Sequence, residues 1–425
     1  MGVIYFFLKP CVRIGLKIFF RKIFFSNKEN IPSKGATIYA LNHPTAFIDP
    51  MVLASIAKPS MYFMLRGDMF KSSFAKWFLN QINAIPIFRF RDGFSKLKNN
   101  AGTLENVYKK LNEGGNIIIL AEGQTLHEKK MRPIQKGAAR MAFGAYEKFG
   151  RSDITIVPVG VNYTDSDKFR SDVMLDFGPA IELKHYLDDY KDNPRETIKN
   201  LTAEVSKRMR ARIIHINDSK REPVANILLE LKRNLTAHKI LPIVDPKRQQ
   251  LQEEWELAEK INTFSNAQFE KVAVKANEYK SLLHGLSLTD KSLARHSSYN
   301  WKNTLILFIG LIPFMIGAIL NLPPALLANY ISKKKVRKIE FGSSVRFAVG
   351  LFGWMIYFVI LSLLLNAVGW HWWMILAIPF LGYFSLVWFD LFRVWNGARN
   401  YRDLPESVKE EFVEIRDLLL DVVNQ

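Results

Sequence analysis

The stretch ATIYALNHPTAFIDP, residues 36–50, joins a short apolar segment to a polar turn that contains proline. Residues 36–41 have the β-branched and aromatic content of a buried strand. Because the residue before a proline is pushed out of the helical region, His43 is predicted to stay extended where that strand ends. Thr45 can then cap a short helix. The stretch therefore predicts a strand, a turn and a helix in succession.

His43 and Asp49 can meet only if the chain turns between them. In one continuous helix, two residues six positions apart point about 120° away from each other, and Pro44 supplies the turn that avoids this. The carboxylate of Asp49 can then accept the imidazole N–H, fix the tautomer and leave the other ring nitrogen as a general base. The alternative is a histidine that closes a turn, with Asp49 bonded only to backbone amides.

The chain from Ile31 to about Ile214 alternates strand-like and helical segments. The predicted fold class is α/β, with a buried mixed sheet flanked by helices. We expect strands at 36–41, 116–120, 154–161 and 173–177, and helices at 95–112 and 135–148.

Further charged residues, and one glycine, follow predicted strands or stand near the start of a predicted helix. They are Arg89 and Arg91 at the end of the strand-like residues 84–89, Glu122 and Gly123 after the strand at 116–120, and Arg132, Lys136 and Arg140 around the start of the helix at 135–148. Singly, such groups are usually solvated surface charges. Together with a histidine at a strand end, they provide what a site for a phosphorylated acceptor needs.

Composition narrows the partners of the 425-residue chain. A formal net charge of +19 predicts an anionic partner, which is nucleic acid, an acidic substrate or a membrane surface. The cations cluster beside apolar segments and form no aromatic-interleaved groove, so we expect no nucleic acid partner. The single cysteine, Cys11, excludes an internal disulfide framework and a Cys-rich metal site. No metal is expected. No bound cofactor is expected either.

Residues 1–25 are predicted to be an amphipathic basic helix that lies at a membrane interface. Its cations recur at every fourth position, which places them on one helical stripe facing anionic headgroups: Lys9, Arg13, Lys17 and Arg21. The alternatives are a signal anchor or a helix packed on the folded domain. A cleaved signal peptide fits less well, because the charges run through the apolar region.

The rest of the chain changes character twice. Residues 216–300 are charged and favour helix, with a structural or docking role, and residues 301–395 form a membrane region. Two spans are expected at about 347–368 and 372–392. Pro323 and Pro324 predict that 304–331 is instead a re-entrant or broken hairpin. An acidic helical tail is expected at 396–425.

The basic residues that flank the two spans set the orientation. Lys333 to Lys338 precede the first span, and Arg393 to Arg402 follow the second, whereas the connection between the spans lacks Lys and Arg. Basic flanks stay on the cytoplasmic side. Both basic segments are therefore expected to be cytoplasmic. With the catalytic domain also expected on the cytoplasmic face of the membrane, residues 304–331 must enter and leave on that same face.

Four ordered blocks resemble the glycerolipid acyltransferase superfamily, often called PlsC-like. The blocks are Asn42 to Pro50, Ala84 to Arg89, Glu122 with Gly123, and Val157 to Gly160. The resemblance implies an acyltransferase domain over residues 26–215. It also implies that His43 deprotonates an acceptor hydroxyl, that Asp49 orients His43, and that the arginine and Glu-Gly blocks bind glycerol phosphate. Pro158, in the fourth block, is expected at the acyl pocket, on a strand that its proline would place at a sheet edge.

Two departures from the usual family pattern point to a subgroup. The spacing between His43 and Asp49 is one residue longer than the commonest spacing, and the third block lacks its arginine. Both features resemble the fungal glycerol 3-phosphate or dihydroxyacetone phosphate acyltransferases and some bacterial relatives. Phosphate binding is then expected to rest on the cations named above: Arg89, Arg91, Arg132, Lys136 or Arg140.

The resemblance implies a membrane-bound O-acyltransferase of phospholipid synthesis. The expected reaction moves a fatty acyl group from a thioester of coenzyme A or acyl carrier protein to a hydroxyl of glycerol 3-phosphate or 1-acylglycerol 3-phosphate. Anionic membrane lipids are further expected partners. The alternative is a non-catalytic, membrane-anchored protein that binds lipid or acts as a scaffold, and the complete set of His43, Asp49, Arg89 and Glu122 argues against it.

Overall fold

The structure is a computed structural model that describes residues 2–57, 59–87, 100–236 and 241–424. Internal contacts divide the chain into two compact units. Unit 1 comprises Met1–His215, Ile240–Arg248 and Val336–Phe347, and unit 2 comprises Ile216–Lys239, Gln249–Lys335 and Ala348–Gln425. Unit 1 is therefore assembled from three separate stretches of sequence.

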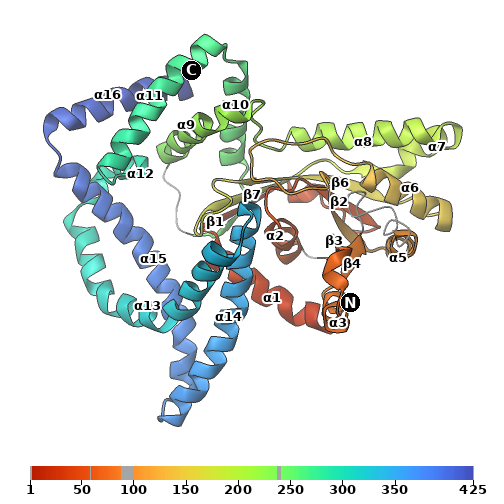
Figure 1. Cartoon of the computed structure of the whole chain (residues 1–425), viewed down its shortest axis with the longest axis horizontal. Helices are drawn as coiled ribbons and strands as arrows, with labels where there is room; N and C mark the ends of the chain where they lie inside the picture. The colour runs from red at the N-terminus through yellow and green to blue at the C-terminus, as the bar shows by residue number, and fades with distance from the viewer. Residues whose placement is uncertain (1, 58, 88–99, 237–240, 425) are drawn as a thin grey trace. The chain divides into compact units, whose positions relative to one another are not determined.

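Nine strands of the described residues form one mixed sheet in the order β4-β3-β5-β2-β6-β7-β1-β9, with β8 paired to β6 (Figure 1). The strands are β1 Lys22–Ser26, β2 Thr37–Leu41, β3 Met61–Arg66, β4 Ala84–Ile87, β5 Asn116–Leu120, β6 Thr155–Tyr163, β7 Asp172–Phe177, β8 Ile181–Glu182 and β9 Val244–Asp245. Neighbours from β4 through β6 run parallel, whereas β7 is antiparallel to β6. The carboxyl ends of β2, β5 and β6 therefore meet at one edge, where open α/β sheets bind ligands.

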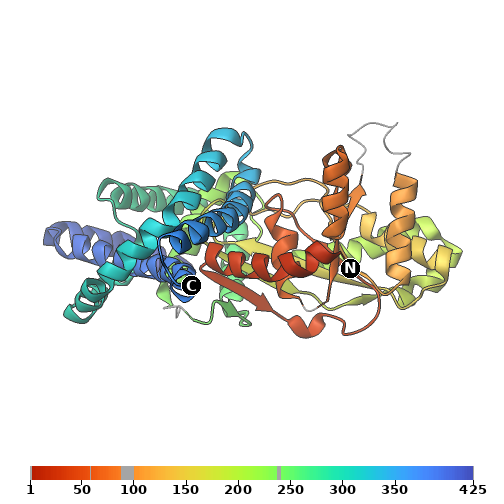
Figure 2. The same ribbon diagram turned by 90° about the horizontal axis from the view of Figure 1, so that it is seen from below.

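Helices cover both faces of this sheet (Figures 1 and 2). They are α1 Val3–Phe19, α2 Ile48–Ile56, α3 Ser73–Gln81, α5 Asn100–Asn112, α6 Gly137–Phe149, α7 Leu187–Asp192 and α8 Pro194–Arg210. Ile38 and Ala40 of β2 share a buried core with residues of α5, α6 and α8. Because side chains alternate along a strand, Tyr39 and Leu41 face the opposite side, where α1 and α2 lie. The predicted α/β class is confirmed.

The four predicted strands and the helix at 135–148 are confirmed to within a few residues. Of the helix predicted at 95–112, the structure describes the part from Asn100 onward. The prediction for residues 1–25 is wrong at its end, because α1 ends at Phe19 and the fully buried strand β1 follows. Its Ile23, Phe24 and Phe25 are strong strand formers, and pairing with β7 and β9 buries them.

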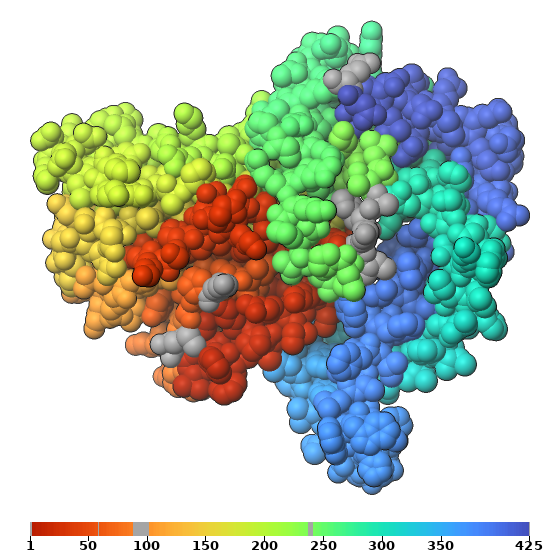
Figure 3. Space-filling model, turned by 180° about the vertical axis from the view of Figure 1, so that it is seen from behind, coloured from red at the N-terminus to blue at the C-terminus, as the bar shows by residue number. Residues whose placement is uncertain are grey.

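The sequence predicts that the cations of α1 face lipid headgroups. In the structure, two of them, Lys9 and Arg13, instead bond to the folded domain. Nζ of Lys9 donates to the carbonyls of Ala57 (2.9 Å) and Pro59 (3.2 Å), and Nε of Arg13 donates to the carbonyl of Ser55 (2.6 Å). These carbonyls lie at the end of α2, where a helix attracts positive charge. The exposed residues of α1 are mostly apolar, with Arg13 also exposed, and the space-filling view shows this N-terminal segment at the surface (Figure 3). Its exposed apolar residues include Val3, Phe6, Phe7 and Ile14.

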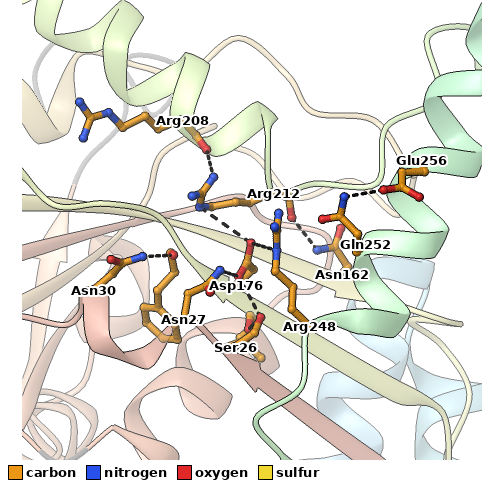
Figure 4. Close-up of polar contacts among 12 residues, drawn as sticks. Ser26, Asn27, Asn30, Asn162, Asp176, Arg208, Arg212, Arg248, Gln252 and Glu256 are labelled. Carbon is orange, nitrogen blue, oxygen red and sulfur yellow. Dashed lines mark hydrogen bonds and ion pairs between the residues drawn. The ribbon is translucent and has the colours of Figure 1, made fainter.

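Asp176 of β7 contacts residues from separate parts of unit 1, including Arg212 and Arg248 from its later sequence (Figure 4). Its carboxylate is fully buried and accepts hydrogen bonds from Oγ of Ser26 (2.8 Å), Nδ2 of Asn27 (2.6 Å) and Nε of Arg248 (3.2 Å). Nε of Arg212 lies 3.8 Å from the same carboxylate. Residues from four parts of the sequence are thereby held at one buried charge.

The larger elements of unit 2 are all helices in the part of the chain that the structure describes. They are α9 Glu222–Leu235, α10 Gln249–Thr263, α11 Asn266–Gly285, α12 Asp290–Ala294, α13 Trp301–Lys335, the part of α14 Ile339–Ala367 after Phe347, α15 Trp372–Arg402 and α16 Glu406–Asn424. Apart from β9, which pairs with β1 in unit 1, the larger elements described within 216–300 are helices, as the sequence predicts. The acidic tail docks as α16, since Nε of Arg416 donates to Asp290 (2.8 Å) and Phe412 packs edge-on against Tyr279.

Among the residues that the structure describes, three helices are long and apolar enough to cross a membrane: α13, α14 and α15. The predicted break of 304–331 into two segments is wrong, because α13 continues through Pro323 and Pro324 and curves instead (Figure 1). Nδ2 of Asn321 donates to the carbonyls of Gly317 (2.9 Å) and Ile378 (3.1 Å). The bond to Ile378 joins α13 to α15 close to this pair of prolines. Whether α13 spans or re-enters stays a prediction.

Candidate active site

The candidate site lies where β2, β5 and β6 end. Asn42 and His43 follow β2, Glu122 lies two residues after β5, and Tyr163 is the last residue of β6. These strands are parallel neighbours, so their last residues are brought to one edge of the sheet although they are far apart in sequence. The site is therefore built by the order of the strands.

His43 and Asp49 form the predicted pair. Nδ1 of His43 lies 3.0 Å from Oδ2 of Asp49, and both residues are buried, Asp49 completely. The chain turns after Pro44, and α2 begins at Ile48, so that Asp49 points back from the first turn of the helix. A carboxylate at Nδ1 keeps that nitrogen protonated and leaves Nε2 free to accept a proton.

Three more donors hold the carboxylate of Asp49. The amide of Thr45 donates to Oδ2 (3.0 Å), the hydroxyl of Thr45 donates to Oδ1 (2.7 Å), and the phenol of Tyr163 donates to Oδ1 (2.7 Å). Burial beside Asp49 raises the pKa of Tyr163, so its phenol stays protonated and acts as a donor. The expected cap by Thr45 is wrong: Phe47 is the N-cap residue of α2, and Thr45 binds Asp49 instead.

The backbone around His43 is held from both sides. Asn42 exchanges two hydrogen bonds with the backbone of Val161 in β6, of 2.9 and 2.7 Å. The amide of His43 donates to Oε2 of Glu122 (3.3 Å), and its carbonyl accepts from the amide of Leu126 (3.4 Å). The loop after β5 therefore fixes the position from which the imidazole projects.

Glu122 has a structural contact that its predicted substrate role did not include. Its second oxygen, Oε1, accepts from the amide of Arg132 (3.1 Å). One carboxylate therefore bonds both the backbone of His43 and the backbone of the basic segment. Burial raises the pKa of Glu122, opposed by these two amide hydrogen bonds. Gly123 follows with φ of +69°, a conformation that favours glycine. Direct binding of substrate by Glu122 and Gly123 stays a prediction.

Arg132, Lys136 and Arg140 follow Glu122 in sequence, and the backbone amide of Arg132 contacts the carboxylate of Glu122. Nη2 of Arg132 donates to Glu128 (3.0 Å). Within the described part of the chain, its Nη1 is buried without a hydrogen-bond partner. Lys136 is the N-cap residue of α6, Arg140 lies one turn later, and both are exposed. A guanidinium with a donor to spare, next to a helix start, suits an anionic group.

Two predicted sets of residues are not among the contacts described above. Arg89 and Arg91 are outside the described residues. Pro158 lies on β6, which is a central strand between β2 and β7 and not the edge strand that its proline predicted. Alternation along β6 places Pro158 on the opposite face from Tyr163. Its role at an acyl pocket stays a prediction.

Sequence reasoning missed Tyr163 and the side-chain role of Asn42. Tyr163 reads as an ordinary aromatic residue at the end of a strand, and its contact with Asp49 joins positions 114 residues apart. Within the described ranges, no group of three or more His, Cys, Asp or Glu side chains could hold a metal ion. The site therefore consists of a buried His–Asp pair, its neutral donors and a nearby basic segment.

A buried His–Asp pair at a strand end has the chemistry needed to accept a proton from a hydroxyl group. Residues 22–162 match the family model Acyltransferase, so the chain contains a domain of that family. The resemblance noted from the sequence blocks is thereby confirmed.

Two yeast proteins are similar to this chain. It is 33% identical over 108 residues to glycerol-3-phosphate O-acyltransferase 2 of Saccharomyces cerevisiae, covering 25% of this chain and 14% of the relative. It is 26% identical over 252 residues to glycerol-3-phosphate O-acyltransferase 1 of the same yeast, covering 56% and 32%. The chain thus spans about a third or less of these relatives.

One solved structure was also similar to this chain. The crystal structure of the 1-acyl-sn-glycerophosphate acyltransferase PlsC from Thermotoga maritima matches with a TM-score of 0.34 and 17% identity, covering 47% of this chain and 78% of that chain.

Proposed function

We propose that this protein is a membrane-bound O-acyltransferase that moves a fatty acyl group from an acyl thioester to a hydroxyl of glycerol 3-phosphate. The observation that carries the proposal is the 3.0 Å contact between Nδ1 of His43 and Oδ2 of Asp49 inside an acyltransferase-family domain. A protein that only binds lipid has no use for a histidine held in this way.

The proposed reaction is a direct transfer. Nε2 of His43 takes the proton of the acceptor hydroxyl, and the hydroxyl oxygen bonds to the thioester carbonyl carbon. The carbon–sulfur bond then breaks, and the thiol of the donor leaves with a proton from the imidazolium. Asp49 stabilises the imidazolium while it exists. Coenzyme A or acyl carrier protein supplies the thioester as a substrate, and no further cofactor is involved.

Phosphate recognition falls to the basic segment after Glu122. Arg132 has a buried Nη1 with no partner among the described residues, and Lys136 and Arg140 are exposed nearby in sequence. The names of both yeast relatives specify glycerol 3-phosphate, which supports that acceptor over 1-acylglycerol 3-phosphate. Arg89 and Arg91 are proposed as additional phosphate contacts on sequence grounds.

Membrane attachment follows from the three apolar helices and from the exposed apolar face of α1. We place the catalytic domain on the cytoplasmic face because the basic segments at both outer ends of α14 and α15 obey the positive-inside pattern. Since Lys9 and Arg13 are engaged by α2, α1 would contact lipid mainly through its apolar side chains.

The test offers the purified full chain in lipid nanodiscs both acceptors, each with acyl coenzyme A and acyl carrier protein donors, and identifies the lipid formed. We expect 1-acylglycerol 3-phosphate from glycerol 3-phosphate. Arg132→Ala should raise the acceptor KM about tenfold, and Arg132→Lys less, while the donor KM stays unchanged. If the chain acylates 1-acylglycerol 3-phosphate but not glycerol 3-phosphate, the acceptor assignment is overturned. If no pair of donor and acceptor gives a product, the proposed acyltransferase activity is overturned.

A further inference from the structure

The loop that carries the His–Asp pair is held by a segment almost 300 positions later. The loop residues Ala46 and Phe47 precede α2, where backbone amides have no partner within the helix. The amide of Ala46 donates to the carbonyl of Glu340 (3.1 Å), and the amide of Phe47 donates to Oγ of Ser344 (2.9 Å). Both acceptors belong to the first turns of α14, which are part of unit 1.

The contact between the loop and the start of α14 includes a buried hydroxyl and a ring–ring contact. Ser344 is fully buried, and the ring of Phe341 packs edge-on against the ring of Phe47 at 5.8 Å between centroids. Phe347 packs in the same manner against Phe19 of α1, at 5.6 Å. The start of α14 is thus anchored to the loop and to α1 together.

The hydrogen bonds at the loop form a complete set. Thr45 donates its amide to Asp49, Ala46 donates to Glu340, and Phe47 donates to Ser344, so three successive amides are all satisfied. Asp49 fixes one and α14 fixes two. If the Ser344 hydroxyl were lost, the partly buried amide of Phe47 would lose its acceptor, and the loop would shift to recover one.

We propose that Ser344 is a positioning residue for the His43–Asp49 pair, and that the first turns of α14 hold the catalytic loop in its working geometry. The inference rests on the proposed acyltransferase function for its consequence on catalysis. The same helix continues as a candidate membrane span, so the loop is ordered by an element that belongs to the membrane region of the sequence. Neither the motif blocks nor the acyltransferase-family match, which ends at residue 162, includes it.

The first test measures catalysis by the full chain in nanodiscs. Ser344→Ala should lower kcat about five- to tenfold, which is the worth of one buried hydrogen bond, with both KM values changed less than twofold. Ser344→Thr, which keeps the hydroxyl, should recover at least half of the lost kcat. Ser362→Ala is the matched control, because it removes a hydroxyl from the same helix that donates only to the carbonyl of Phe358. It should leave kcat unchanged.

The second test is independent of activity. Hydrogen exchange by mass spectrometry should show faster exchange in peptides covering residues 44–49 in Ser344→Ala than in the unmodified chain, with no change over residues 116–120 of β5. Should Ser344→Ala not fold, Phe341→Leu replaces it, since it removes the ring contact with Phe47 and should also speed exchange and lower kcat. Unchanged kcat and unchanged exchange in a folded variant would overturn the inference. An inactive unmodified chain with the expected exchange pattern would overturn only the proposed function.

Discussion

Two aspartates in unit 1 are buried to the same degree and yet are surrounded by different chemistry. Asp176 is held by Ser26, Asn27 and the guanidinium of Arg248, with Arg212 close by. Arginine is always charged, so the carboxylate of Asp176 is compensated permanently. A carboxylate held in this way joins segments of the fold. Its charge is already neutralised by arginine and cannot stabilise a further cation.

Asp49 accepts from neutral donors and from an imidazole. Thr45 gives an amide and a hydroxyl, Tyr163 gives a phenol, and His43 gives Nδ1. Neutral donors hold the carboxylate still without cancelling its charge. That charge can therefore stabilise an imidazolium when His43 takes up a proton. The comparison teaches that the charge of the partners, and not burial, separates the two roles.

Removing the imidazole should have the largest effect. His43→Ala deletes the proposed base, and we expect acyl transfer to fall at least about 10³-fold while membrane attachment and yield are kept. The measurement is product formation under saturating substrates. The control is His185→Ala, which removes an exposed histidine of the same unit. Retention of more than a few per cent of activity would exclude His43 as the base.

The two aspartates should respond in opposite ways to the same substitution. Asp49→Asn should lower kcat about 10²-fold or more with a small change in stability, since the amide cannot stabilise the imidazolium. Asp176→Asn should instead destabilise unit 1 by about 3 kcal/mol, because it leaves buried guanidinium charge uncompensated. Thermal melts and kcat are measured on both variants. Equal loss of stability, or equal loss of kcat, would remove the distinction.

Tyr163→Phe sharpens the comparison by deleting one neutral donor. The carboxylate of Asp49 keeps three of its four contacts, and we expect kcat to fall about tenfold with KM values unchanged. Tyr190→Phe is the matched control, because the phenol of Tyr190 also donates to a carboxylate, Glu147, at 2.8 Å. If both variants keep full kcat, Tyr163 only fills space.

The smallest effect concerns Glu122 and pH. Burial raises the folded pKa of Glu122 above its unfolded value of about 4.3. Its contribution to stability is therefore complete below that value and is lost as pH rises through the folded pKa. The Tm of the unmodified chain minus that of Glu122→Gln should decrease as pH rises, by no more than about 2 °C. Glu270→Gln, at an exposed position of α11, should give a constant difference.

Part of the site follows from local sequence. Pro44 between His43 and Asp49 restricts the backbone strongly enough to predict that the two side chains meet, and the pair is found at 3.0 Å. The strand at 116–120 was equally readable from its continuous β-branched residues. Local physics determines these features, so they need no knowledge of the rest of the fold.

The remainder depends on which strands become neighbours. Tyr163 reaches Asp49 only because β6 lies beside β2, and Ser344 reaches Phe47 across 297 positions. The sequence predicts helix as far as residue 25 because cations recur at every fourth position up to Arg21, whereas pairing with β7 makes Lys22–Ser26 a strand. Contacts of this kind are made by topology, and the residues that make them carry no distinctive pattern.

The position of β9 has a consequence for synthesis on the ribosome. β1 is paired on one side by β7 and on the other by β9, which is made about 70 positions after β7. Until β9 emerges, β1 presents an open edge to other nascent chains. A chaperone that shields this edge would be needed most in that interval, and a polypeptide released early would be prone to aggregate through it.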